Sequence, residues 1–417
     1  MAQLSDDCFA FGGPLMSVEA AVAIIAARVT AVAETENVGL LHADGRILAA
    51  DVVAPLPLPP FTNSAVDGYA VRSSDLGTGE LLLPVSGRVQ AGAASQQPIA
   101  AGHAMRIFTG APMPEGADTV FMQEDVKLDG AGNVLLPQGL KAGANVRPAG
   151  EDVAKGISAL PTGSRLRPQD LALVAAFGIA QVSVRRRIRV AVFSTGNELT
   201  SPGASRGTAQ QFDSNRFMLM ALLSRLGCEV ADLGIISDDC GLLAGALRNA
   251  AAAHDLILTS GGVSTGEEDH VKAAVESVGS LVLWRMAIKP GRPVAMGIID
   301  GTPVIGLPGN PVASFVTFAH VVRPTVFALA GAMPQRLAPM PIRAAFSYRK
   351  KIARREYVRV SMRHGADGLL EVTKFPREGA GLLSSLVETD GLVELGEQIT
   401  QVDPGDVVGF LSYASLL

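Results

Sequence analysis

Strand and helix patterns alternate along residues 188–331, and this alternation limits the folds that the region can adopt. Each short apolar run, typical of a buried strand, is followed by a longer stretch with helical spacing of its apolar residues. The order predicts a doubly wound, mainly parallel α/β sheet. The predicted strands are residues 190–193, 229–236, 256–258 and 303–305, and the predicted helices are residues 215–226, 242–252, 270–278 and 311–330.

The chain as a whole should form several domains, because 417 residues exceed the roughly 250 to 300 residues of a single core. Ser17 can cap a helix that runs to about residue 32. The segment Pro55-Leu-Pro-Leu-Pro-Pro60 cannot be helical and predicts an extended crossing between two bodies.

Short β-type runs then indicate a small β domain over about residues 81–137. A turn and a helix follow over residues 161–178, with Gly178 at the helix end. From about Pro334 the tail returns to β patterning, with a turn at Asp403-Pro-Gly-Asp406. The tail therefore predicts a small β barrel or sandwich.

Composition excludes several classes of function. A net charge of −5 lacks the basic surface that nucleic-acid binding usually requires, and the apolar runs are too short to cross a bilayer, so neither a nucleic-acid nor a membrane partner is expected. Asp6 and Asp7 stand where a secretory signal carries basic residues, so the N-terminal residues are not expected to form a signal peptide. The three cysteines show no C-x-x-C spacing, which favours the reducing cytoplasm, and the scattered histidines disfavour zinc. A bound metal would have oxygen ligands.

Gly-rich or polar loops follow all four predicted strands. In an open α/β sheet, ligands bind outside the carboxyl ends of the strands, where helix N-termini favour anions. Gly, Asn and Asp also build ordinary turns, but four such loops on one edge favour a site. Neither a dinucleotide fingerprint nor a P-loop occurs. The segments are Ser194-Thr-Gly-Asn-Glu-Leu199 with Asp213-Ser-Asn-Arg216, Ser237-Asp-Asp239, Ser260-Gly-Gly-Val-Ser-Thr-Gly266, and Gly306-Leu-Pro-Gly-Asn-Pro311.

Charges of both signs gather in the same region. Carboxylates are oxygen ligands suited to Mg²⁺, although each alone is also a common helix cap. Cations on a Pro-Gly turn can hold an oxyanion, although Lys and Arg are also ordinary surface residues. The carboxylates are Glu198, Asp238, Asp239 and Asp269, and the cations are Arg285, Lys289 and Arg292.

The order of these motifs resembles the molybdopterin molybdenumtransferase family, called MoeA in bacteria, along nearly the whole chain. Besides the loops above, the resemblance rests on Ser64-Ala-Val-Asp-Gly-Tyr-Ala70, Thr109-Gly-Ala-Pro112, Lys289-Pro-Gly291 and Leu307-Pro-Gly-Asn-Pro311. It is least specific in the tail.

The resemblance implies a homodimer of elongated four-domain subunits. The expected divisions are 1–52 with 153–185, then 53–152 as a small β domain, 186–334 as the molybdopterin-binding α/β domain, and 335–417 as a C-terminal β barrel. The active site would lie between the α/β domain of one subunit and the β domain of the other. The reaction would insert molybdate into adenylylated molybdopterin and release AMP. A molybdopterin adenylyltransferase and molybdoenzyme maturation factors are possible further partners.

The resemblance also implies roles for single residues. The catalytic set would be Asp67, Thr109, Glu198 and Asp269. Mg²⁺ would be the cofactor, held by Glu198, Asp238 and Asp269. Molybdate would bind Arg285, Lys289 and Arg359. The remaining substrate would contact Ser194, Thr195, Gly196, Asp213, Asn215, Ser260, Gly261, Gly262, Ser264, Gly266, Pro308, Gly309 and Asn310.

Some positions depart from the family pattern. Asn197 and Thr62 stand where bacterial relatives often have Asp, Arg285 replaces a Lys, and Ala380 falls at a Ser position that would contact molybdate.

Two other functions are compatible with parts of the chain. The preceding adenylylation step would use the α/β domain alone, and a receptor-binding scaffold shares the architecture. The β domains count against an adenylylation enzyme, which would not need them. The intact acidic loops count against a scaffold without catalysis.

Overall fold

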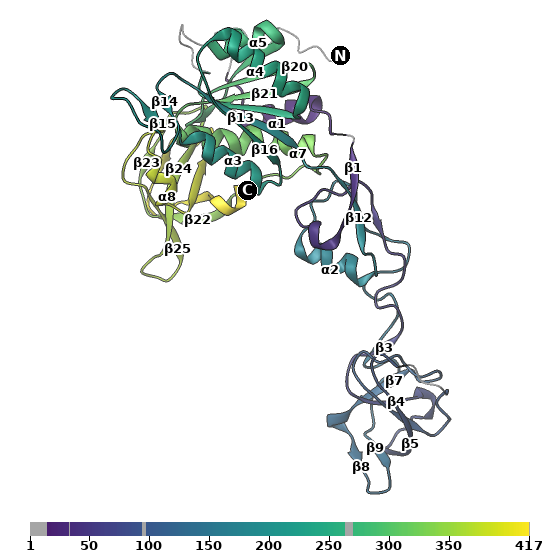
Figure 1. Cartoon of the computed structure of the whole chain (residues 1–417). Coiled ribbons are helices and arrows are strands. Elements are labelled where there is room, and N and C mark those ends of the chain that lie inside the picture. Colours follow the sequence, from purple (N-terminus) through teal and green to yellow (C-terminus); the bar gives the residue numbers. More distant parts are fainter. Residues whose placement is uncertain (1–14, 33, 94–96, 263–269, 417) are drawn as a thin grey trace.

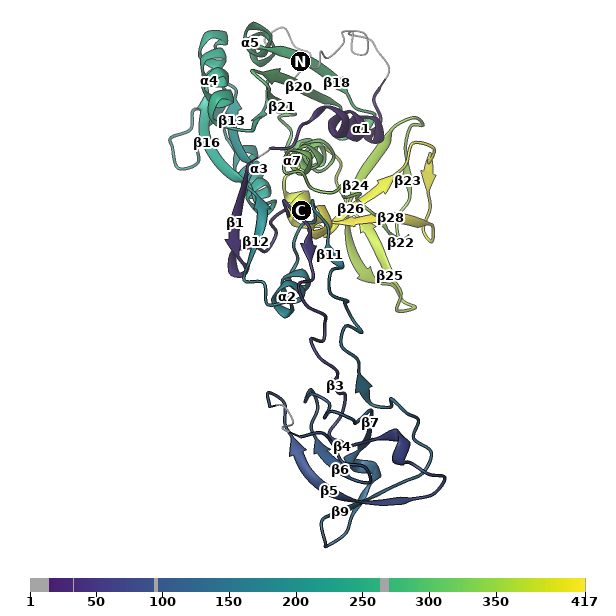
Figure 2. The same ribbon diagram turned by 90° about the vertical axis from the view of Figure 1, so that its right-hand side faces the viewer.

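The computed structural model describes residues 15–32, 34–93, 97–262 and 270–416. The β domain lies at one end of an elongated molecule, and the α/β domain and the C-terminal barrel lie together at the other (Figure 1). A small domain and two extended chain segments connect the two ends (Figure 2).

The α/β domain contains the predicted sheet, with strand order β16-β13-β17-β21-β20-β18. The first four strands are parallel, whereas β20 runs antiparallel to both neighbours, so the prediction of a mainly parallel sheet is confirmed. The apolar pattern of the sequence does not predict β18 and β20. The strands are β13 (Arg189–Thr195), β16 (Glu229–Ile236), β17 (Leu256–Ser260), β18 (Ser280–Arg285), β20 (Pro293–Ile299) and β21 (Thr302–Leu307).

Helices cover both faces of this sheet because the central strand β13 is apolar on both sides. Val190 and Val192 pack into the cluster with α3 and the 311–329 helix, and Ala191 and Phe193 pack into the cluster with α4 and α5. Burying one such large side chain contributes roughly 1.5 to 3 kcal/mol. The helices are α3 (Asn215–Arg225), α4 (Cys240–Ala253) and α5 (His270–Val278).

The predicted helix over residues 311–330 is continuous but contains a π-helical turn. It comprises α6 (Pro311–Thr317), the π turn η5 (Phe318–Val322) and α7 (Arg323–Leu329). Pro324 lies at the start of α7 and cannot donate to the preceding turn, which accounts for the wider turn there. The stretch Pro311–Leu329 is long and apolar enough to cross a membrane, yet 83% of its apolar window is buried inside the protein, as in a core helix.

The β domain forms one sheet of order β7-β4-β6-β5-β9-β8, with an apolar cluster on each face. The short β-type runs expected between residues 81 and 137 are strands. They are β4 (Gly68–Val71), β5 (Leu81–Val89), β6 (Ala104–Ile107), β7 (Thr119–Met122), β8 (Lys127–Leu128) and β9 (Asn133–Leu136).

Two extended segments connect this domain to the rest of the chain. The proline-rich segment is extended, as predicted, and pairs with the returning chain at Leu58, whose N–H donates to the carbonyl of Val153 at 2.8 Å. Closer to the β domain, β3 (Asn63–Ser64) pairs with β10 (Val146–Arg147).

The small connecting domain is built from two separated stretches. Helix α2 (Pro168–Ala176) packs on two short antiparallel strand pairs, β1 (Thr35–Gly39) with β12 (Gln181–Arg185) and β2 (Val52–Val53) with β11 (Ser158–Leu160). Helix α1 (Val18–Arg28) is capped by Ser17 as predicted but ends earlier than residue 32. It packs on α7 and η5 instead of on this domain, because its buried face enters the α/β core.

The C-terminal region is a closed barrel, as predicted, in which β24 pairs with β25, then β22, β28, β26 and β24 again. The strands are β22 (Met340–Ala344), β24 (Arg355–His364), β25 (Leu370–Lys374), β26 (Gly391–Leu395) and β28 (Val407–Ser412), with the short helix α8 (Ser384–Val387). One extra strand from the α/β domain, β19 (Ile288–Lys289), pairs with β24. The remaining short pairs are β14 (Leu199–Thr200) with β15 (Gln211–Phe212) and β23 (Tyr348–Arg349) with β27 (Gln401–Val402).

A substitution of Gly68 tests the packing of the β domain. A Cβ atom at this position would lie 1.8 Å from the Phe121 carbonyl oxygen, so Gly68→Ala should destabilise the domain by about 3 kcal/mol or more. Scanning calorimetry of the full chain measures the shift. Gly130→Ala is the matched control, because nothing lies within 4 Å of its Cβ position. Equal stability of the two variants would contradict this packing.

Candidate functional site

The strand order places an opening at the carboxyl edge of the sheet. Strand β13 lies between β16 and β17, so the chain leaves β13 towards one side and later returns to its other side. Loops diverge at such a switch point, and ligands of doubly wound sheets bind there. The two loops that border this point follow Thr195 and Ser260.

The loop after β13 is held by Asp238, which follows β16. The carboxylate of Asp238 accepts hydrogen bonds from the Thr195 hydroxyl and, at 3.2 Å, from the Asn197 backbone N–H. Gly196 has a φ of +144°, and a Cβ atom there would lie 2.5 Å from the Glu198 carboxylate. Only glycine therefore lets Glu198 fold back over the loop, where its exposed carboxylate is available to a ligand.

Asn215 joins three of the predicted loops. Its amide nitrogen donates to the Ser260 hydroxyl at 2.8 Å and to the Gly309 carbonyl at 2.7 Å. Within the described residues, its amide oxygen is buried without a partner, as is the hydroxyl of Ser194. Because buried polar groups are normally satisfied, these two atoms call for a partner that the described residues do not supply.

The other predicted substrate residues that the structure describes form hydrogen bonds or close contacts that hold the loops at the carboxyl edge of the sheet. The carboxylate of Asp213 accepts from Arg216 Nε at 2.8 Å, which fixes the start of α3. The N–H of Gly261 donates to the Leu307 carbonyl at 3.0 Å, and Gly262 approaches Val271 too closely for any side chain. Pro308 and Asn310 lie at the N-terminus of α6, where their carbonyl oxygens accept from Ser314. The predicted residues Ser264, Gly266 and Asp269 lie outside the described residues.

The metal assignment stays a prediction. In the part of the chain that the structure describes, no three His, Cys, Asp or Glu side chains form a group that could hold a metal. Asp238 nevertheless accepts a hydrogen bond from Asn197, which precedes Glu198, and the carboxylates of Asp238 and Glu198 are of the type that Mg²⁺ prefers. The third predicted ligand, Asp269, is not among the described residues.

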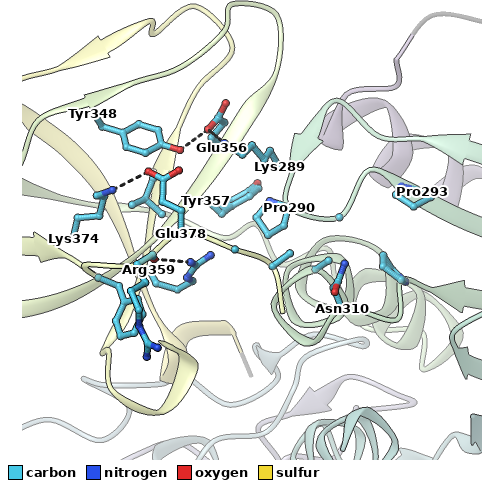
Figure 3. A pocket seen from close by; sticks show the side chains of 18 residues that line it. Lys289, Pro290, Pro293, Asn310, Tyr348, Glu356, Tyr357, Arg359, Lys374 and Glu378 are labelled. Atoms are coloured by element: carbon cyan, nitrogen blue, oxygen red, sulfur yellow. Dashed lines mark hydrogen bonds and ion pairs between the residues drawn. The ribbon is translucent and has the colours of Figure 1, made fainter. Parts of the chain in front are cut away.

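A cavity of about 360 Å³ opens between the α/β domain and the barrel, and most of its charged side chains come from the barrel (Figure 3). Pro308 and Asn310 line one side of it, so it adjoins the carboxyl edge of the sheet. Its principal polar side chains are Lys289, Tyr348, Glu356, Arg359, Lys374 and Glu378.

Lys289 is held in this cavity by the pairing of β19 with β24, which places it opposite Glu356. The two side chains form an ion pair at 3.4 Å. Glu356 is only 1% exposed, and it also accepts from the Tyr348 hydroxyl and from Arg354 Nε, both at 2.7 Å. Burial, together with the hydrogen bond to Glu356, raises the pKa of Tyr348, so Tyr348 remains a neutral hydrogen-bond donor.

Arg359 is the second predicted oxyanion residue that reaches the cavity. It is 9% exposed, and its Nε has no partner among the described residues. Burial lowers the pKa of Arg359, although the guanidinium still remains charged at neutral pH. A buried cation with a free N–H group is suited to bind an oxyanion.

Arg285 does not join Lys289 and Arg359. Arg285 is exposed at the end of β18, and Arg292 is exposed in the turn before β20. Neither side chain lines the cavity. The antiparallel pairing of β18 with β20, which the sequence pattern did not reveal, places Arg285 opposite Pro293.

Asp67 and Thr109 form a separate pair in the β domain. One carboxylate oxygen of Asp67 accepts from the Thr109 backbone N–H at 2.8 Å and from its hydroxyl at 2.7 Å. These two hydrogen bonds, with a smaller contribution from Arg106, lower the pKa of Asp67. Figure 1 shows β4 of the β domain at the far end of the molecule from β14, the strand that directly follows Glu198 in the chain. One chain therefore does not bring the two predicted clusters together.

Comparison with known sequences identifies the family. The sequence family described as MoeA N-terminal region (domain I and II) matches residues 16–178, the probable molybdopterin binding domain matches 191–328, and MoeA C-terminal region (domain IV) matches 341–413. The chain is 39% identical, over 92% of its length and 95% of the relative, to molybdopterin molybdenumtransferase of Haemophilus influenzae. The chain belongs to the molybdopterin molybdenumtransferase family.

Other relatives agree with this assignment to the molybdenumtransferase family. Molybdopterin molybdenumtransferase 2 of Mycobacterium tuberculosis is 36% identical over 88% of this chain and 93% of its own. The crystal structure of a molybdopterin biosynthesis MoeA protein from Pyrococcus horikoshii OT3 superposes with a TM-score of 0.81 at 28% identity, covering 96% of this chain and all of that one. The resemblance on which the site predictions rest is thus confirmed.

Several polar residues of the cavity escaped the sequence analysis, because the motifs of the molybdenumtransferase family are least specific in the tail. The family resemblance implies a role only for Arg359 in the tail, whereas Tyr348, Lys374 and Glu378 also line the cavity. The sequence does contain a clue to Glu356. It stands at the same alternate positions as the apolar Val358 and Val360, which lie on the buried face of the strand. A carboxylate at a core position of a strand calls for a partner.

Replacing Thr109 by valine tests the Asp67 pair. Thr109→Val removes the hydroxyl donor but keeps the backbone N–H, so the pKa of Asp67 should rise towards its ordinary value. A ¹³C NMR titration of the aspartate carboxyls measures this, and the pKa of Asp51, lowered by Thr162 and Ser158, should stay unchanged.

The same substitution should alter stability in one pH range. A lowered folded pKa stabilises the protein above the unfolded pKa, and this stabilisation disappears as the pH falls through the folded value. Wild type should therefore exceed Thr109→Val in stability near pH 7, and this part of the difference should vanish in acid. An unchanged Asp67 pKa in the variant would contradict the assignment.

Proposed function

We propose that this protein inserts molybdate into adenylylated molybdopterin, releases AMP, and thereby forms molybdenum cofactor. One observation carries the proposal: the cationic cavity with Lys289 and Arg359 adjoins Pro308 and Asn310 at the ligand-binding edge of the sheet. An oxyanion and a phosphorylated pterin can therefore bind side by side. The names of relatives that match 92% and 88% of the chain support the same reaction.

The sheet edge would hold the phosphorylated part of the substrate. Backbone N–H groups at the N-terminus of α6 and the glycines of the Ser260 loop favour phosphate oxygens. The free amide oxygen of Asn215 and the hydroxyl of Ser194 can bind polar groups of the pterin or nucleotide. The edge thus orients the substrate towards the cavity.

Catalysis would be electrostatic, without a nucleophilic side chain. Lys289 and Arg359 would hold the molybdate oxygens while molybdenum binds the two dithiolene sulfurs. As the two thiol sulfurs replace one molybdate oxygen, that oxygen would leave with their two protons as water. A water molecule would add to a phosphorus of the phosphoanhydride as its bond breaks, and AMP would be released. Glu198 and Asp238, together with Asp269, would hold Mg²⁺, which offsets the charge of the leaving phosphate when bound.

The complete site would require a second copy of the chain. Asp67 and Thr109 are fixed to one another, yet they lie in the β domain, away from their own Glu198 (Figure 1). A two-fold dimer would place them at the sheet edge of the partner subunit. We place the reaction in the cytoplasm, in agreement with the free thiols of Cys228 and Cys240.

Release of AMP tests the reaction. Purified protein with adenylylated molybdopterin and Mg²⁺ should release AMP only when molybdate is added, and Asp67→Ala and Glu198→Ala should each lower the rate at least about 100-fold. Chromatographic quantification of AMP measures this, and consumption of ATP in place of AMP release would indicate the adenylylation step. Turnover untouched by either substitution would refute the proposed site.

Mixing two inactive variants tests the shared site. A heterodimer of Asp67→Ala and Glu198→Ala subunits contains one doubly altered site and one intact site. Random exchange of equal amounts should therefore restore about one quarter of wild-type activity. A mixture of Glu198→Ala with Asp238→Ala is the control, since both residues come from the same α/β domain and neither site is intact. No recovery in the first mixture would place the whole site within one chain.

A further inference from the structure

The cavity contains a carboxylate in the place where an oxyanion would be bound. Glu378 accepts a hydrogen bond from Lys374 Nζ at 2.9 Å. In Figure 3 the Glu378 carboxylate points into the middle of the cavity, between Lys374, Tyr348 and Arg359. A side chain of this chain thus occupies part of the space that an anionic ligand needs.

Three cations act on this carboxylate. The hydrogen bond from Lys374 is the main reason why the pKa of Glu378 is lowered, and the charges of Lys289 and Arg359 lower it further. The same three cations would attract a bound oxyanion. Glu378 and the oxyanion therefore compete for one set of positive charges.

Glu378 and Glu356 differ in how firmly they are held. Glu356 is 1% exposed and receives hydrogen bonds from Tyr348 and Arg354 in addition to its pairing with Lys289. The Glu378 side chain is 66% exposed, and Lys374 is its one hydrogen-bond partner among the described residues. Glu356 is a fixed counter-charge, whereas Glu378 can leave the cavity without exposing the core.

The chain around Glu378 permits such a movement. Glu378 lies on an irregular segment between β25 and α8, and the next residue, Gly379, has a φ of +139° that side chains rarely adopt. Lys374 is held independently, because it ends β25 and its ammonium lies 5.5 Å from the centre of the Tyr348 ring. Lys374 would therefore remain in the cavity after Glu378 has left.

We propose that Glu378 is an internal counter-anion which an incoming oxyanion displaces, and that Lys374, once released, becomes an oxyanion ligand. The proposal rests on the proposed function of this cavity. It gives Glu378 the role of setting the affinity, because every anion must first break the Lys374 pair. Anions that bind too weakly to do so are kept out of the cavity.

Direct binding of molybdate to the full chain tests the proposal. Equilibrium dialysis with molybdate alone, followed by elemental analysis for molybdenum, gives the dissociation constant. Glu378→Gln should bind about three to ten times more tightly than wild type, since it removes the competitor but keeps the side-chain size. Lys374→Met should bind more weakly by a similar factor.

Two further variants make the result specific. Glu388→Gln removes the same charge from an exposed position of the barrel that does not line the cavity, and it should leave the affinity unchanged. In the double variant Lys374→Met/Glu378→Gln the gain from Glu378→Gln should be smaller, because Glu378 then competes only for Lys289 and Arg359 and no longer for Lys374. Thermal unfolding of each variant verifies that the barrel is intact.

The outcomes distinguish this inference from the proposed function. If wild type binds molybdate while Glu378→Gln binds equally or less tightly, the counter-anion role is wrong and the oxyanion site stands. If neither wild type nor Glu378→Gln binds molybdate, both the cavity assignment and the counter-anion role fail. Tighter binding by Glu378→Gln, with no gain in Glu388→Gln, supports the proposal.

Discussion

The site depends on the burial of strand β13 on both of its faces. Its apolar residues alternate between two cores, so helices must cover both sides of the sheet and the strand must be central. With β16 on one side and β17 on the other, the carboxyl ends of three parallel strands meet at one edge. Thr195, Asp238 and Ser260 are brought together by this arrangement, although they are far apart in the chain.

A second constraint joins the barrel to this sheet. Strand β19 belongs to the α/β domain but pairs with β24 of the barrel, and the Arg355 N–H donates to the Ala287 carbonyl at 2.7 Å. The pairing fixes Lys289 beside Glu356 and aligns the cavity with the start of α6. The cationic cavity is thus a property of the contact between two domains.

The β domain holds the Asp67–Thr109 pair, which lies away from the sheet edge of its own chain. Its sheet fixes Asp67 against Thr109, and the tight contact of Gly68 with Phe121 explains why glycine follows that aspartate. The extended connection keeps this ordered pair away from the sheet edge of the same chain (Figure 2). Asp67 is half-buried and Thr109 is exposed. An ordered pair of this kind, far from its own sheet edge, suits a surface that meets a second subunit, which is the arrangement that we propose.

The sequence alone determined the α/β fold, the strand-end loops and the family. Strand and helix periodicities are local, and the glycines of the Gly196 and Gly261 loops follow from local backbone demands. The amino-acid sequence therefore predicts the alternation along residues 188–331 and the position of Lys289 on its Pro-Gly turn.

The tertiary structure decided which charged residues face one another. The antiparallel pairing of β18 with β20 places Arg285 outside the cavity. Tyr348, Lys374 and Glu378, which come from the tail, line the cavity. The tertiary structure also packed α1 on α7. Barrel closure and strand register are set by contacts between residues distant in sequence, and the local pattern of a β strand does not encode its neighbours.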